Sequence, residues 1–331
     1  MTVESRWMEV GGRRCRVFCA GPRPSVSGDV GEWGGCPLLV QLVSERQEED
    51  LEREAEMIFS GLDQLNTYHL TLNTVFVAVP VRDWELELMP WAEPAVSKRP
   101  EVGTGAGETL RYLMEALLPA VLPPPPAGTP PCEGGELSYP LPLRVLPLEK
   151  GESWGEPVRA MKVPACELCA APRCEGGEPG RAMEVPACEL YAAPLDKGSC
   201  RAATEGFAPI ILGGYSLAGL FALWAACQTD RFGAVVAGSP SLWAGDWPGY
   251  AAGHAMQARQ VYLSLGDREE RSRNRTFARV GDRIREEHRR LQQQLGEENT
   301  TLVWEEGGHF ADPAARMARG FVWCLSLKIR I

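Results

Sequence analysis

The stretch that most constrains this chain is residues 206–222, which read Gly-Phe-Ala-Pro-Ile-Ile-Leu-Gly-Gly-Tyr-Ser-Leu-Ala-Gly-Leu-Phe-Ala. An apolar run at residues 209–212 is typical of a buried strand. Two glycines, a tyrosine and Ser216 follow, and small and apolar residues then recur at helical spacing as far as Cys227. The order predicts a strand, a sharp turn with a serine at its corner, and a helix.

A serine at such a corner is typical of a nucleophile elbow, in which a tight turn holds the nucleophile in strained backbone geometry. The turn requires small residues two positions before and after the serine, and Gly214 and Ala218 occupy those positions. The second glycine of the usual motif comes one position late, at Gly219, but alanine adds only a methyl group, so we expect the turn to form. The backbone N–H of Leu217 would then lie at a helix N-terminus, where it can stabilise an oxyanion. The alternative is a buried serine at an ordinary corner.

The composition of the chain indicates which kinds of partner and which location to expect. The chain has 331 residues, is 44% hydrophobic and carries a formal net charge of −10. It can therefore bury a large core, and we expect it to bind neither nucleic acid nor an anionic membrane. No apolar run approaches the roughly 18 residues of a membrane-spanning helix, and the N-terminus does not have the pattern of a secretory signal. We expect a cytoplasmic protein whose cysteines are reduced thiols.

Strands and helices are expected to alternate along the chain. A Gly11-Gly12 turn within residues 6–20 predicts a β-hairpin. Further buried strands are expected at residues 37–43, 74–81, 209–212, 233–236, 260–265 and 301–304. Helices are expected at residues 51–62, 108–122, 275–295 and 313–325. This alternation predicts an α/β fold with a mostly parallel central sheet flanked by helices.

Residues 123–205 interrupt the alternation with a tract rich in Pro, Gly, Glu and Cys. Within it, residues 159–172 recur almost unchanged as residues 181–194. Two copies are too few for a solenoid, and the frequent prolines disfavour both helix and central strand. We therefore expect one domain over residues 1–331, with an irregular, disordered insertion before the nucleophile strand.

A metal site in this tract is not expected. Cys166 and Cys169 are spaced like zinc ligands, and Cys174 lies nearby. The second copy of the repeat, however, has Tyr191 where the first has Cys169, so the repeat does not preserve the spacing. We interpret these residues as reduced thiols.

A serine becomes a nucleophile near neutral pH only with a base in reach and an acceptor that orients the base. Three acids follow the strand at 260–265, and one histidine follows the strand at 301–304. Of the four histidines in the chain, only His309 lies at a strand end after the acids. Spacing from the preceding glycine favours Glu269 as the acid, with Asp267 second and Glu270 third.

Several segments together resemble the esterase branch of the α/β-hydrolase superfamily, which includes enterochelin-esterase-like enzymes, esterase D and the mycolyltransferases. The matching residues are 83–84 with 90–91, 214–224, 238–243, 263–270 and 307–312. The similarity covers residues 6–122 and 206–331. Ala218 departs from the family's second glycine, and the tract at 123–205 has no counterpart in the family.

The resemblance implies the α/β-hydrolase fold and a two-step acyl transfer without metal or cofactor. Ser216 would attack the carbonyl of a small-molecule ester, His309 would act as general base, and Glu269 or Asp267 would orient it. The oxyanion would be held by the N–H of Leu217 and by a second N–H after the first core strand. Candidates for that second donor are Val43 and Ser44. Candidate substrate-binding residues are Tyr215, Trp84, Trp91 and Trp243.

The preferred hypothesis is a serine carboxylesterase. Because a triad fixes only acyl transfer, an acyltransferase or a serine peptidase stays open. The alternative from another class is a catalytically silent protein of the same fold that binds a ligand or a partner.

Overall fold

The computed structural model describes residues 2–20, 37–65, 74–91, 105–122 and 209–326. They all belong to one compact unit built from Met1–Leu143 and Gly206–Ile331. A second unit, Arg144–Glu205, lies wholly outside the described residues, and so does the rest of the predicted insertion at 123–205 with its repeat and its cysteines. The prediction of an irregular insertion in a single domain therefore stays a prediction.

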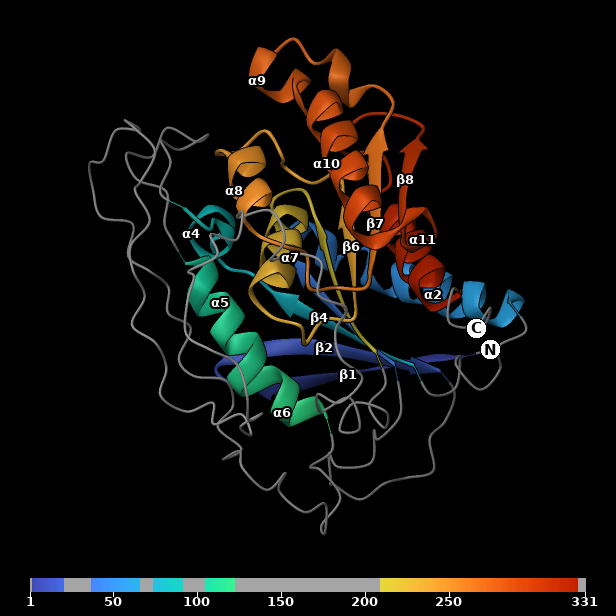
Figure 1. Cartoon of the computed structure of the whole chain (residues 1–331). Helices are drawn as coiled ribbons and strands as arrows, with labels where there is room; N and C mark the ends of the chain where they lie inside the picture. The colour runs from blue at the N-terminus through green and yellow to red at the C-terminus, as the bar shows by residue number, and fades with distance from the viewer. Residues whose placement is uncertain (1, 21–36, 66–73, 92–104, 123–208, 327–331) are drawn as a thin grey trace, which may run out of the picture. The chain divides into compact units, whose positions relative to one another are not determined.

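The described residues form an eight-stranded sheet in the order β1-β2-β4-β3-β5-β6-β7-β8 (Figure 1). The β1–β2 and β2–β4 pairs are antiparallel, and every other pair is parallel. The predicted mostly parallel sheet is thus confirmed. The strands are β1 (Val3–Val10), β2 (Arg13–Ala20), β3 (Leu38–Val43), β4 (Val75–Pro80), β5 (Ile210–Tyr215), β6 (Ala234–Gly238), β7 (Gln260–Gly266) and β8 (Thr300–Glu305).

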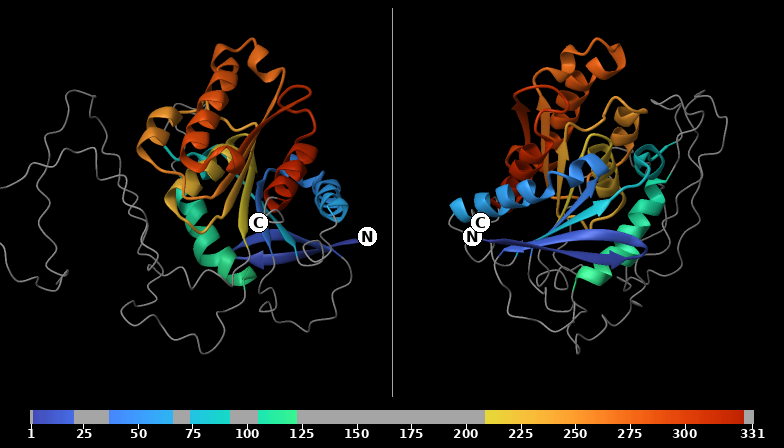
Figure 2. Two further views of the ribbon diagram at one scale, coloured as in Figure 1. Left: turned by 45° about the vertical axis from the view of Figure 1, so that its right-hand side comes forward. Right: turned by 180° about the vertical axis from the view of Figure 1, so that it is seen from behind.

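Helices cover both faces of this sheet (Figure 2). On one face, α2 and α11 pack together over the strands, and on the other lie α5, α7 and α10. The helices are α1 (Glu45–Glu48), α2 (Leu51–Gln64), α4 (Trp84–Leu88), α5 (Ala106–Tyr112), α6 (Leu118–Val121), α7 (Leu217–Gln228), α8 (Trp247–Gly253), α9 (Arg275–Ala278), α10 (Val280–Leu295) and α11 (Pro313–Ser326). In the described part of the chain, no helix is both long and apolar enough to cross a membrane.

Two predicted helices differ in detail from the observed ones. The helix expected at 108–122 contains a π-helical turn at Leu113–Leu117, between α5 and α6. Pro119 follows this turn and has no backbone N–H to donate, which accounts for the local change in hydrogen bonding. The helix expected at 275–295 is divided into α9 and α10.

The parallel register brings the carboxyl ends of four strands to one edge of the sheet. Tyr215 of β5 lies opposite Gly238 of β6, which in turn pairs with Ser264 of β7. At the end of β7, Gly266 pairs with Glu305 of β8. The loops that leave these four strands are therefore neighbours, although they come from segments far apart in the chain. Such an edge is where α/β folds build their ligand sites.

Candidate active site

Ser216 occupies a strained corner between β5 and α7. Its backbone angles are φ 58° and ψ −119°, a region that non-glycine residues rarely adopt. Gly214 makes the turn possible, because a Cβ atom at this position would overlap the backbone carbonyl of Ala218. The methyl group of Ala218 is itself accommodated in the core. The predicted strand, turn and helix are thus present, and the serine lies at the corner.

Gly214→Ala is therefore expected to destabilise the fold by about 3 kcal/mol, because the overlap is with backbone and cannot be relieved by a rotamer change. A matched control is Gly253→Ala at the end of α8, where a Cβ would meet nothing within 4 Å. The control should change stability by no more than about 1 kcal/mol, in the stabilising direction. Chemical denaturation of both variants measures the difference. Equal stabilities would show that the elbow tolerates a Cβ at Gly214.

A continuous chain of hydrogen bonds joins Ser216 to His309 and Glu269. Ser216 Oγ lies 3.0 Å from Nε2 of His309, and Nδ1 of the same ring lies 2.7 Å from Oε2 of Glu269. The three residues follow β5, β8 and β7, whose carboxyl ends meet at one edge of the sheet. A neutral imidazole that donates from Nδ1 leaves Nε2 free to accept the serine proton.

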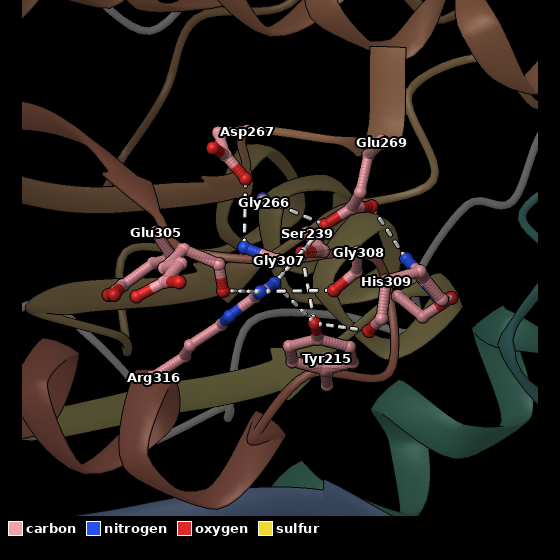
Figure 3. A network of polar contacts seen from close by, with 12 residues as sticks. Tyr215, Ser239, Gly266, Asp267, Glu269, Glu305, Gly307, Gly308, His309 and Arg316 are labelled. Atoms are coloured by element: carbon pink, nitrogen blue, oxygen red, sulfur yellow. Dashed lines mark hydrogen bonds and ion pairs between the residues drawn. The ribbon is translucent and has the colours of Figure 1, made fainter. Parts of the chain in front are cut away.

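The second carboxylate oxygen of Glu269 is also fully engaged. Oε1 accepts hydrogen bonds from Ser239 Oγ at 2.6 Å, from the Gly266 N–H at 2.8 Å and from Arg316 Nη1 at 3.1 Å (Figure 3). Burial raises the pKa of this carboxyl, but hydrogen bonds from His309 and Ser239 outweigh that effect and hold the pKa below its ordinary value. Glu269 is therefore an ionised acceptor at neutral pH, as a base-orienting acid requires.

The other two candidate acids have different partners. Asp267 accepts a hydrogen bond from the Gly307 N–H at 2.8 Å, so this carboxylate holds the backbone of the histidine loop (Figure 3). Glu270 forms an ion pair with Arg285 of α10 at 2.7 Å. The structure thus brings Glu269, the first-ranked of the three acids, to His309 and directs Asp267 and Glu270 to other partners.

Tyr215 does not lie where a substrate-binding residue was expected. Its side chain is buried with the apolar residues under α2 and α11, on the same face as Ile211. The hydroxyl donates to the His309 carbonyl oxygen at 2.6 Å and lies 3.0 Å from Ser239 Oγ. Burial is the main reason that the pKa of Tyr215 is raised to about 12. Tyr215 thus holds the backbone of the loop that carries His309. These contacts do not support its predicted contact with substrate.

The predicted oxyanion donors are Leu217, Val43 and Ser44, and Leu217 has the expected placement. Leu217 is the first residue of α7, so its N–H lies at the N-terminus of a helix beside Ser216. Ser44 instead donates its backbone N–H to Oε1 of Gln47 at 3.0 Å, in the capping box that starts α1. Val43 is the buried last residue of β3. The Ser44 prediction is therefore not supported, because its N–H already has a partner.

The three predicted tryptophans pack mainly against protein. Trp84 begins α4 and is half-buried against the core. Trp91 lies against Gly245 and Tyr250, with 5.7 Å between the Trp91 and Tyr250 ring centroids. Trp243 packs on Phe277 with a centroid distance of 4.7 Å. These are contacts within the protein, and the predicted substrate contact of the three tryptophans stays a prediction.

Sequence reasoning missed three residues around Ser216, His309 and Glu269. Ser241 Oγ lies 3.2 Å from Ser216 Oγ, and the Ser241 N–H donates to the Ser216 carbonyl at 3.0 Å. Phe310 presents an 80% exposed side chain and packs edge-on against the His309 ring at 5.0 Å. Arg316 is buried against Glu269. Adjacency to His309 could have pointed to Phe310, and the Gly-Ser-Pro-Ser sequence could have pointed to Ser241.

Comparison with known proteins gives matches among solved structures alone. The sequence matches no protein-family model and no curated protein. The siderophore hydrolase EstB from Aspergillus nidulans is 15% identical with a TM-score of 0.50, and the alignment covers 97% of this chain and 93% of that one. EstA from the same organism is 15% identical with a TM-score of 0.49, covering 98% and 93%. The enterobactin esterase FES from Shigella flexneri is 15% identical with a TM-score of 0.47, covering 100% of this chain and 61% of that one. The similarity to EstB, together with the sheet order, shows that the chain has the α/β-hydrolase fold.

Proposed function

We propose that this α/β-hydrolase-fold chain is a serine esterase that cleaves small-molecule carboxylic esters through an acyl-enzyme on Ser216. The observation that carries the proposal is the unbroken path of hydrogen bonds from Ser216 through His309 to Glu269. These three residues follow the ends of three different strands, and Ser216 is held in strained backbone geometry. A serine with only a structural role would need neither arrangement.

The proposed reaction begins when His309 Nε2 accepts the proton of Ser216 as Oγ attacks the ester carbonyl carbon. Glu269 holds the imidazole in the tautomer that can accept at Nε2, and it stabilises the imidazolium that forms. The Leu217 N–H faces the developing oxyanion. Collapse of the tetrahedral intermediate breaks the ester bond, and His309 donates its proton to the leaving alcohol. Water then attacks the acyl-enzyme with His309 again as base.

Two neighbouring residues support this assignment. While Ser216 donates its hydroxyl hydrogen to His309, its oxygen can accept a hydrogen bond from the Ser241 hydroxyl 3.2 Å away. That bond would fix the orientation of the nucleophile. Phe310 offers an exposed phenyl ring next to His309, which favours substrates with an apolar group near the leaving alcohol.

The test combines hydrolysis of p-nitrophenyl esters, from acetate to octanoate, with labelling by a fluorophosphonate probe. We expect hydrolysis, and we expect one probe molecule bound per chain. Trypsin places Ser216 and its two neighbouring serines on different peptides. The peptide of residues 202–231 has Ser216 as its only serine, and the peptide of residues 232–259 contains Ser239 and Ser241. Mass spectrometry should find the label on the first peptide. A folded protein that hydrolyses no ester and resists the probe would instead support the ligand-binding alternative.

A further inference from the structure

Arg316 is a buried cation in the middle of an otherwise apolar helix surface. Its side chain is 1% exposed, and the other buried residues of α11 are alanine, glycine, methionine, phenylalanine, cysteine and leucine. Burying a guanidinium group costs several kcal/mol unless hydrogen bonds and an opposite charge compensate it. The partners of Arg316 therefore indicate what the residue does.

One end of the guanidinium group contacts the acid of the triad and its supports. Nη1 lies 3.1 Å from Glu269 Oε1, 3.1 Å from Ser239 Oγ and 2.9 Å from the Tyr215 hydroxyl oxygen. Figure 3 shows these acceptors converging on the same nitrogen from three different strand ends. Arg316 thus neutralises the carboxylate from the side opposite His309.

The other end holds the backbone of the loop that carries the histidine. Nη2 donates to the carbonyl oxygens of Gly308 at 3.0 Å and Glu306 at 3.3 Å. Between these residues lies Gly307, whose φ of 102° suits glycine. A planar guanidinium group can bond in two directions at once, whereas a lysine ammonium acts as a single point charge. Arg316 therefore fixes the distance between the acid and the histidine loop.

We infer that Arg316 is a positioning residue for the triad. It holds the Glu269 carboxylate and the 306–309 backbone in one rigid frame, so that Oε2 stays aligned with Nδ1 of His309. The inference rests on the proposed esterase function. In addition, we expect activity to depend on Arg316, although this side chain contacts neither the substrate nor Ser216.

The charge of Arg316 should also set the pH range of activity. The ionisable side chains in contact with Glu269 are His309 and Arg316, and Tyr215 lies beside them. The ionisable neighbours of Glu269 in the sequence are Asp267, Arg268, Glu270 and Arg271, and Glu270 pairs with Arg285 of α10. Among them, Arg316 is the buried permanent cation in contact with the acid. Loss of this positive charge favours binding of a proton by the Glu269–His309 pair, whichever of the two residues carries that proton. The acid limb of the rate profile should therefore move to higher pH.

The test compares Arg316→Met and Arg316→Lys with wild type, using kcat, KM, the pH profile of kcat/KM and thermal melts. Arg316→Met should lower kcat about 10²-fold with little change in KM, since misplacement of a catalytic group costs about that much. Its acid limb should move to higher pH. Arg316→Lys keeps the charge but loses the loop contacts, so it should keep the wild-type acid limb with an intermediate kcat. Arg319→Met is the matched control, because Arg319 is on the same helix, is 52% exposed and pairs with Glu305.

A direct readout separates this inference from the proposed function. The Nδ1 proton of His309 in its bond to Glu269 should give a low-field NMR resonance, assigned by its loss in His309→Gln. That resonance should be lost or shifted in Arg316→Met and kept in Arg319→Met, whether or not the protein turns over an ester. If Arg316→Met changes neither the resonance nor the pH profile and only lowers the melting temperature, Arg316 has a structural role alone and the inference is wrong. If Arg316→Met does not fold, wild-type kcat in a folded Arg316→Lys would overturn the inference.

Discussion

Replacing Ser216 with alanine is expected to lower kcat for ester hydrolysis about 10⁶-fold, the scale of losing the nucleophile of a triad. The alanine side chain has no oxygen to attack the carbonyl, and His309 then has no serine proton to accept. The residue keeps its Cβ, so the strain at φ 58° is the same in both proteins. The variant loses the side-chain hydrogen bonds of Ser216 to His309 and Ser241. Each is worth about 1 kcal/mol, so the protein should stay folded, with a melting temperature lower by about 4–8 °C.

The control for this experiment is Ser241→Ala, which removes the neighbouring hydroxyl and leaves the nucleophile in place. We expect it to lose no more than about tenfold in kcat, the value of one neutral hydrogen bond. Fluorophosphonate labelling should disappear in Ser216→Ala and persist in Ser241→Ala. Hydrolysis by Ser216→Ala within about tenfold of wild type would contradict the assignment of the nucleophile. Loss of labelling in Ser241→Ala alone would move that assignment to the second serine.

Much of the arrangement around Ser216 could be predicted because it depends on local pattern. The strand before it is a short apolar run, and the turn requires the small residues at Gly214 and Ala218. His309 could be singled out because parallel strands end at one edge of the sheet, and it is the histidine that follows a strand there. These inferences need only element type and order, which periodicity gives.

The choice among the three acids could not be made from the sequence, because it depends on side-chain direction. Glu269 begins a one-turn 3₁₀ helix three residues after the end of β7, and that turn directs its side chain back to the Gly266 N–H and to His309. Two residues earlier, Asp267 is directed to the Gly307 backbone. Arg316 was missed for a related reason, since its partners come from four separate strand ends and no local pattern connects them.

For two of the predicted residues, the sequence also contained a signal of the contacts that they make in the structure. Side chains alternate across a strand, so Tyr215 must share a face with Ile211, under α2 and α11. Likewise, Ser44 and Gln47 have the spacing of a capping box, which engages the backbone N–H of its first residue. Those two rules therefore argue against Tyr215 as a pocket wall and against Ser44 as an oxyanion donor.

Glu269→Gln is expected to lower kcat about 10⁴-fold, and Asp267→Asn only about tenfold. An amide at position 269 can donate to Nδ1, which favours the tautomer with a proton on Nε2, and that tautomer cannot accept the serine proton. The same change leaves the buried Arg316 cation without its counter-charge, at a cost of about 3 kcal/mol in stability. In Asp267→Asn, the amide oxygen can still accept from the Gly307 N–H, so the loop keeps its anchor.

The pH dependence of stability gives an independent check on the same residue. Folding lowers the pKa of Glu269 below its ordinary value of 4.5, so the ionised form stabilises the folded protein. That contribution is complete above the ordinary value and is lost as the pH falls through the lower folded pKa. Glu269→Gln should therefore flatten the fall in thermal melt on acidification, while Asp267→Asn should keep it. Small and equal kinetic losses in the two variants would contradict the triad, because no acid would then be orienting His309.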